Sequence, residues 1–216
     1  MELHLKEMPV ADFLNALGSD APAPGGGAAS GLSGALAAAL GKMVADLTIK
    51  RKKYEQYHEL AKDASSVLAI LIDDFRTLSE EDAKAYARYS EAIALPTNNE
   101  EEIEKRKSAL NQAILYSTEV PCRVIDKAME TVKTLEMLYG KSNKTCMGDL
   151  AAAAEELNTA CKLAWLNVLA NLPYLPDPKD AHIIMKEKRS LLDEIQSRCS
   201  DLYSKVENDI LNSFVN

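Results

Sequence analysis

The segment 21–54 constrains the fold more than any other part of the chain, because a proline- and glycine-rich loop leads directly into a long run of small side chains. Pro22 and Pro24 do not fit inside a helix, and the three glycines that follow can adopt positive φ or permit a close backbone contact at little steric cost. We therefore expect a tight loop here, followed by a helix over about residues 28–49.

This expected helix carries few large side chains. Between residues 28 and 41 the large ones form one narrow ridge at four-residue spacing: Leu32, Leu36 and Leu40. The rest of its surface lets another backbone come close, so we expect the helix at the centre of the molecule. Residues 21–41 form an uncharged segment, and its length is about that of a membrane span. Their Pro, Gly, Ala and Ser content nevertheless favours a core helix, and we expect no membrane segment, no secretory signal and a cytoplasmic location.

Helical periodicity covers the rest of the chain. Apolar side chains recur at three- and four-residue steps, and prolines, glycines and polar turns separate the periodic segments. The expected helices cover residues 9–17, 54–95, 99–139, 146–172 and 180–214. We predict an all-α fold of long antiparallel, up-and-down helices in a single domain, residues 1–216. Alanine-rich faces left over on helices of this length predict a helical homodimer or a higher homo-oligomer.

Composition excludes several classes of function. The net charge of −8 and the pI near 5.0 argue against nonspecific nucleic-acid binding, which depends on clustered cations. The histidines are far apart and the cysteines lack C-x-x-C spacing, so we expect neither a metal site nor a disulfide framework. These residues are His4, His58, His182, Cys122, Cys146, Cys161 and Cys199.

The glycine run Gly25, Gly26 and Gly27 could bind an anion. Consecutive backbone N–H groups at a helix N-terminus attract a carboxylate or a phosphate. No Gly-Lys-Ser/Thr follows and no strand precedes the run, so it is neither a Walker loop nor a dinucleotide-binding fingerprint. Spacing alone leaves two alternatives open: an anion site, or glycine used only for close backbone approach.

An acidic run, Glu80-Glu81-Asp82, interrupts the apolar face of the expected helix 54–95. Asp82 lies on the side that continues the apolar pattern, where partial burial would raise its pKa and suit it to general acid catalysis. Spacing alone favours the plainer alternative of a solvated acidic face.

Polar side chains also interrupt the alanine-rich helix 146–172, at Asp149, Asn158, Asn167 and Asn171. Asn167 and Asn171 fall on one face. Buried amides must form hydrogen bonds, either with each other and the backbone or with a heteroaromatic ligand. In the preceding helix, Pro121 removes the hydrogen bond to the Ser117 carbonyl and should kink the chain.

Taken together and in order, several motifs resemble a known family. They are APAPGGGAASGLSGALAAALGKMVADLTIKRKKY at 21–54, EEDAKAYARYSEAIALP at 80–96 followed by EEE, EVP at 119–121, Asn143 six residues before Asp149, and NVLANL at 167–172. Across nearly its whole length the chain resembles the cyclodeaminase/cyclohydrolase family of tetrahydrofolate enzymes, found also as the C-terminal half of formiminotransferase-cyclodeaminase. The resemblance implies an all-α, dimeric or larger enzyme that closes or opens a one-carbon unit between N5 and N10 of tetrahydrofolate.

The resemblance also implies roles for particular residues. The aspartate of the D-A-x-A-aromatic motif, Asp82, is the implied proton donor. Asp149, Asn167 and Asn171 are candidate partners of the pterin, and Asn143 is a further candidate substrate-binding residue. Gly25, Gly26, Gly27, Lys50 and Lys53 are candidate anchors for the anionic glutamate tail, which can be polyglutamylated. The basic cluster has an equal alternative role, since cations suit a helix C-terminus.

The resemblance is compatible with two reactions, and one non-catalytic function remains as a rival. We expect a 5-formiminotetrahydrofolate cyclodeaminase that releases ammonia and forms 5,10-methenyltetrahydrofolate, with methenyltetrahydrofolate cyclohydrolase as the alternative. The tetrahydrofolate derivative is the expected substrate, and we expect no tightly bound cofactor. A non-catalytic helical assembly protein is the rival hypothesis, because residue spacing without the resemblance names no reaction.

Overall fold

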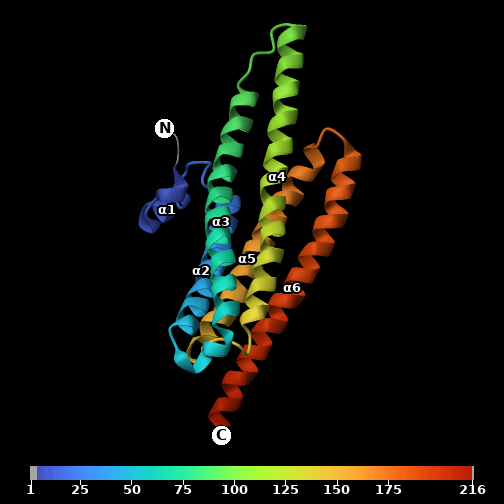
Figure 1. The fold of residues 1–216 in the computed structure, drawn as a ribbon. Coiled ribbons are helices and arrows are strands. Elements are labelled where there is room, and N and C mark those ends of the chain that lie inside the picture. Colours follow the sequence, from blue (N-terminus) through green and yellow to red (C-terminus); the bar gives the residue numbers. More distant parts are fainter. Residues whose placement is uncertain (1–3, 216) are drawn as a thin grey trace.

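The computed structural model describes residues 4–215, and the described residues contain helices and no strand. The six α-helices are α1 (Val10–Leu17), α2 (Gly26–Ile49), α3 (His58–Ile93), α4 (Glu100–Leu138), α5 (Met147–Asn171) and α6 (Pro178–Val215). Four short 3-10 segments join them: η1 (Leu5–Glu7), η2 (Lys52–Tyr57), η3 (Lys144–Cys146) and η4 (Leu172–Tyr174). The prediction of an all-α fold is confirmed. Figure 1 shows the long helices running up and down, with α3 and α4 and their connection projecting beyond the other helices.

The small side chains of α2 allow it to lie in the interior, where it packs against α3 and α5. A Cβ added at Gly31 would lie 2.7 Å from the backbone nitrogen of Ser79, and one added at Gly34 would lie 2.4 Å from the ring of Phe75. Only glycine permits this approach of two helices. The helix is long and apolar enough to cross a membrane, but its buried, glycine-rich faces here are those of a core helix.

Large aliphatic side chains of the other long helices complete the core around α2. Fully buried examples come from α3, α4, α5 and α6: Leu68, Leu71, Phe75, Ile125, Leu135, Leu157 and Ile195. The expected helical dimer stays a prediction, since the structure describes a single chain.

The start of α4 follows the sequence prediction. Asn99 precedes the helix, and its side-chain oxygen accepts a hydrogen bond from the backbone N–H of Glu102 at 2.9 Å. Acidic residues fill the first turn, where their negative charges interact favourably with the positive end of the helix dipole. Further along, α4 continues as one helix through Pro121, which is buried.

Candidate active site

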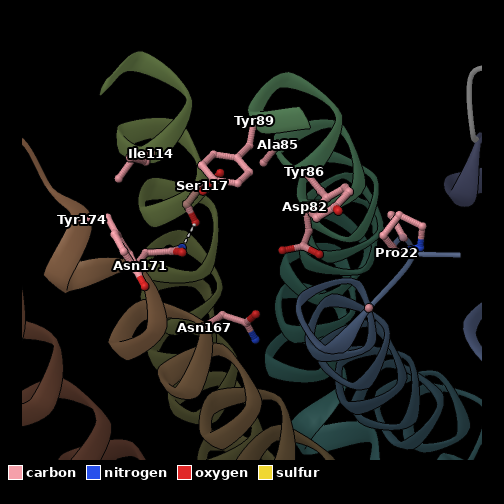
Figure 2. A pocket seen from close by; sticks show the side chains of 12 residues that line it. Pro22, Asp82, Ala85, Tyr86, Tyr89, Ile114, Ser117, Asn167, Asn171 and Tyr174 are labelled. Carbon is pink, nitrogen blue, oxygen red and sulfur yellow. Dashed lines mark hydrogen bonds between the residues drawn. The ribbon is translucent and has the colours of Figure 1, made fainter. Parts of the chain in front are cut away.

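A pocket of about 350 Å³ opens where the N-terminal end of α2 meets α3, α4 and the C-terminal end of α5. Figure 2 shows side chains from α3, α4, α5, η4 and the loop before α2 converging on it. Its lining includes one carboxylate, two amides and three phenol rings, namely Asp82, Asn167, Asn171, Tyr86, Tyr89 and Tyr174. The pocket therefore combines an ionisable group with the flat apolar surfaces and few polar groups of a small-molecule site.

Asp82 is held against the first turn of α2. Its carboxylate accepts a hydrogen bond from the backbone N–H of Ala28. A Cβ added at Gly27 would lie only 1.9 Å from Oδ1 of Asp82. The helix N-terminus thus binds the chain's own carboxylate, and Gly27 is glycine because a side chain would displace that carboxylate. The contact combines the two alternatives for the glycine run, because a backbone N–H of the helix N-terminus binds a carboxylate and Gly27 allows that carboxylate to come close.

The three carboxylates of the acidic run have different environments. Glu80 pairs with Lys84 at 2.7 Å, and Glu81 pairs with Arg123 of α4 at 2.5 Å. Asp82 has no ion-pair partner among residues 4–215 and faces the pocket. The solvated acidic face that spacing favoured is wrong for this run, because the Glu80 and Glu81 side chains are only 16% and 22% exposed and are ion-paired. Asp82 is the carboxylate directed to the site.

Burial raises the pKa of Asp82 above its usual value, and the hydrogen bond from Ala28 only partly offsets this increase. The reason is that desolvation disfavours the ionised carboxylate, while an N–H donor favours it. Asp82 therefore keeps its proton to a higher pH than an ordinary aspartic acid. The same N–H can stabilise the carboxylate once the proton has been given away, which is the combination that a general acid requires.

The two amides of the pocket are each oriented by a backbone carbonyl. Nδ2 of Asn171 donates to the carbonyl of Ser117 at 2.8 Å, and Nδ2 of Asn167 donates to the carbonyl of Leu163 at 2.8 Å. Figure 2 shows the bond between Asn171 and Ser117 across the pocket wall. A carbonyl only accepts, so these bonds fix which end of each amide is nitrogen. The structure thus shows the backbone part of the first alternative for these amides, and hydrogen bonding to a heteroaromatic ligand stays a prediction.

Three tyrosines line the pocket beside Asp82. Tyr86 and Tyr89 come from α3, and Tyr174 lies on η4, just after the end of α5. Tyr86 is 41% exposed and Tyr174 is 67% exposed, so both rings lie at the mouth with faces available to a ligand. Aromatic faces of this kind suit a flat heteroaromatic ring.

The remaining predicted residues lie at the opposite end of α2, which is about 36 Å long at 1.5 Å per residue. Two hydrogen bonds join the end of α2 and η2 to the turn before α5: Asn143 N–H donates to Thr48 Oγ1 at 2.9 Å, and Lys144 N–H donates to the Tyr54 hydroxyl at 3.0 Å. The structure therefore divides the predicted set into two groups. Gly25, Gly26, Gly27, Asp82, Asn167 and Asn171 lie at or beside the pocket, and Lys50, Lys53, Asn143 and Asp149 lie at the other end.

Within one chain the second group does not line the pocket. Asn143 uses its side-chain oxygen to accept from the backbone N–H and the hydroxyl of Thr145, at 3.2 and 3.0 Å. Lys53 lies over the ring of Tyr54. A binding role for Lys50, Lys53, Asn143 and Asp149 stays a prediction, and it requires ligand atoms or a partner chain at that end.

Sequence reasoning missed Ser117 and Tyr174 as lining residues. A signal for Ser117 was present, because Pro121 leaves its carbonyl without a helical donor. No sequence pattern pointed to Tyr174, whose place depends on how η4 turns back over the end of α5.

Comparison with known proteins places this geometry in a family. The family model described as formiminotransferase-cyclodeaminase matches residues 9–190. The chain belongs to this family. The match covers the pocket, both oriented amides and the aspartate, and the recognition from motifs is confirmed.

Two relatives show the range of the family. Formimidoyltransferase-cyclodeaminase of Gallus gallus is 32% identical over 171 residues, which are 79% of this chain and 32% of that protein. Methenyltetrahydrofolate cyclohydrolase of Methylorubrum extorquens is 33% identical over 201 residues, 92% of this chain and 95% of that protein. The chain thus spans about a third of the first relative and nearly all of the second.

A solved structure shares the fold. The crystal structure of formiminotetrahydrofolate cyclodeaminase from Thermotoga maritima matches with a TM-score of 0.79, covering 93% of this chain and 98% of that one at 24% identity. At this identity the likeness shows the fold alone. The two relatives and this structure bear names of two different reactions.

Proposed function

We propose that the protein is a tetrahydrofolate one-carbon enzyme, a 5-formiminotetrahydrofolate cyclodeaminase that forms 5,10-methenyltetrahydrofolate and releases ammonia. The observation that carries the proposal is Asp82, a half-buried carboxyl with a raised pKa at the wall of a pocket lined by tyrosines and amides. Among the residues that the structure describes, no cation pairs with it. The family membership supplies the substrate class.

The chemistry needs an acid in this position. N10 of the substrate attacks the formimino carbon, and the proton that N10 loses passes to the imino nitrogen, which becomes an amine on a tetrahedral carbon. The bond from this carbon to the amine then breaks, and the amine leaves as ammonia only if it has received a proton. A protonated Asp82 donates that proton, which is worth about 10²–10⁴-fold in rate for a positioned acid. The Ala28 N–H then stabilises the carboxylate until solvent returns the proton.

The rest of the pocket binds the substrate. The tyrosine rings flank the flat pterin, and the amides of Asn167 and Asn171 offer hydrogen bonds to its edge. Lys50 and Lys53 remain candidate anchors for a polyglutamate tail, and they would act on ligand atoms far from the pterin or in a partner chain. We propose a homodimer or larger homo-oligomer in the cytoplasm, with no tightly bound cofactor and the tetrahydrofolate derivative as substrate.

The alternative reaction is hydrolysis of 5,10-methenyltetrahydrofolate to 10-formyltetrahydrofolate. The cyclohydrolase relative favours it, because this chain covers nearly all of that protein. Here a deprotonated Asp82 takes a proton from the attacking water and returns it to N5 as the bond from N5 to the bridging carbon breaks. The remaining hydroxyl proton passes to solvent as the formyl carbonyl forms. A raised pKa suits this exchange, since a carboxyl that takes up and returns a proton acts best when its pKa lies closer to the working pH.

Two parallel assays decide between the reactions. The first follows formation of methenyltetrahydrofolate from 5-formiminotetrahydrofolate, and the second follows hydrolysis of methenyltetrahydrofolate. We expect turnover in the first to exceed that in the second. The reverse ranking would assign the cyclohydrolase. Inactivity in both, together with no binding of 5-formyltetrahydrofolate, would leave the non-catalytic helical assembly.

A further inference from the structure

We propose that Pro121 is a positioning residue of this site. It frees the Ser117 carbonyl to hold the Asn171 amide, so that Oδ1 of Asn171 is presented as a fixed acceptor to a ring N–H donor of the ligand. The proposal rests on the proposed function for the identity of the ligand. The positioning itself is independent of the reaction.

Pro121 lacks the backbone N–H that a helical residue would donate. Pro121 lies inside the 39-residue helix α4 and is buried. A residue at this position would normally donate its N–H to the carbonyl four residues earlier, which is that of Ser117. Proline has no N–H, and its ring also displaces that carbonyl from the helix axis. Proline is the most unfavourable residue for a helix interior, so its place here calls for a local reason.

A side chain of another helix takes the place of the missing N–H. Nδ2 of Asn171, at the end of α5, donates to the Ser117 carbonyl at 2.8 Å. An ordinary helical carbonyl accepts from its own N–H and is drawn toward the helix axis, which leaves its second lone pair less accessible to a side chain of another helix. Pro121 thus converts one carbonyl of α4 into a docking point for a side chain of another helix.

The bond to Ser117 fixes how the Asn171 amide faces the pocket. Because the backbone carbonyl of Ser117 can only accept from the amide, Asn171 cannot turn its nitrogen and oxygen around without losing the bond. Asn167, one turn earlier on α5, is fixed in the same sense by the Leu163 carbonyl. Both amides line the pocket, and residues four apart on a helix lie about 5–6 Å from each other. The two oxygens therefore form an acceptor pair suited to a heteroaromatic edge with N–H donors.

The variants Pro121→Ala, Asn171→Ala and their double mutant test the proposal. In Pro121→Ala the helical N–H returns, the Ser117 carbonyl moves back toward the axis, and the Asn171 amide loses its fixed orientation. We expect the Kd for 5-formyltetrahydrofolate and the KM of the active reaction to rise about tenfold, with a smaller change in kcat, since one oriented hydrogen bond is at stake. The matched control is Pro178→Ala, at the exposed first residue of α6, which should leave Kd and KM unchanged.

Coupling separates positioning from a general structural effect. If Pro121 acts through Asn171, the double mutant should bind no more weakly than Asn171→Ala alone. Additive losses in the double mutant, or wild-type Kd and KM in Pro121→Ala, would overturn the proposal.

A crystal structure of Pro121→Ala gives a readout that needs no folate chemistry. We expect the distance from Asn171 Nδ2 to the Ser117 oxygen to exceed the 3.5 Å limit of a hydrogen bond. A bond kept at its present length would overturn the positioning role. If the wild type bound no folate while this bond broke as expected, the proposed function would fail and the positioning role would stand.

Discussion

Replacing Gly27 with alanine perturbs the proposed acid without touching it chemically. The new Cβ would lie 1.9 Å from Oδ1, 2.3 Å from Cγ and 2.6 Å from Oδ2 of Asp82. To reach an ordinary contact of 3.4 Å, the nearest oxygen must retreat by about 1.5 Å. Since misplacing a reacting group by about 1 Å can cost about 10²-fold in rate, we expect kcat of Gly27→Ala to fall by about 10²-fold or more.

Steady-state kinetics and thermal unfolding together test this reasoning. The substrate-binding surfaces of the tyrosines and amides are unchanged, so KM should change less than kcat. Alanine is favoured over glycine in a helix by about 1 kcal/mol, which offsets part of the crowding, and we expect Gly27→Ala to remain folded. Combining it with Asp82→Asn should add no further loss, because both changes disable one group.

The matched control is Gly148→Ala on α5. A Cβ there meets no heavy atom of residues 4–215 within 4 Å, so kcat should be unchanged and stability should rise by up to about 1 kcal/mol. Wild-type kcat in Gly27→Ala would refute the account of Asp82, since the acid would then tolerate displacement.

The remaining predictions concern ionisation and packing. The folded pKa of Asp82 is raised above the usual 3.8, so ionisation of Asp82 destabilises the fold as pH rises through that folded value. Asp82→Asn should therefore be more stable than wild type at neutral pH, with the difference in unfolding free energy vanishing as pH falls below 3.8; an equal difference at all pH values would contradict this origin. In the cyclodeaminase reaction kcat should fall on the alkaline side of the same pKa, and this limb should be absent from the residual activity of Asp82→Asn. Gly34→Ala should lower stability by about 1–3 kcal/mol through overpacking against Phe75, 2.4 Å from the new Cβ; chemical denaturation measures it, and wild-type stability would show that the ring moves freely.

Much of the fold could be predicted because the ends of its helices are set by residues next to them in the sequence. Prolines, glycines and a capping asparagine mark the ends of the helices, and α2 and α4 begin within two residues of the expected positions. Positive φ was one of the two uses offered for the glycines before α2. The structure shows the other, since among the described residues positive φ occurs only at Gly140, and the run serves close approach instead.

The site was harder to predict because it depends on how distant segments pack. Motifs identified Asp82 and the two asparagines, but spacing within α3 could not show that Asp82 meets the first turn of α2. Likewise, motif position alone could not show that Lys50 and Asn143 lie at the end of α2 remote from Asp82. Helix length decides this separation, and it becomes apparent only when the helices are placed side by side.

The most direct measurement of the central claim is single-turnover kinetics of wild type and Asp82→Asn, paired with the Kd of each for 5-formyltetrahydrofolate. Asparagine keeps the shape of the side chain and an acceptor for the Ala28 N–H, but it cannot donate a carboxyl proton. We expect the chemical step to slow by about 10²–10⁴-fold while Kd stays within about threefold, a difference of less than about 0.7 kcal/mol. An unchanged chemical step in Asp82→Asn would contradict the assignment of the acid.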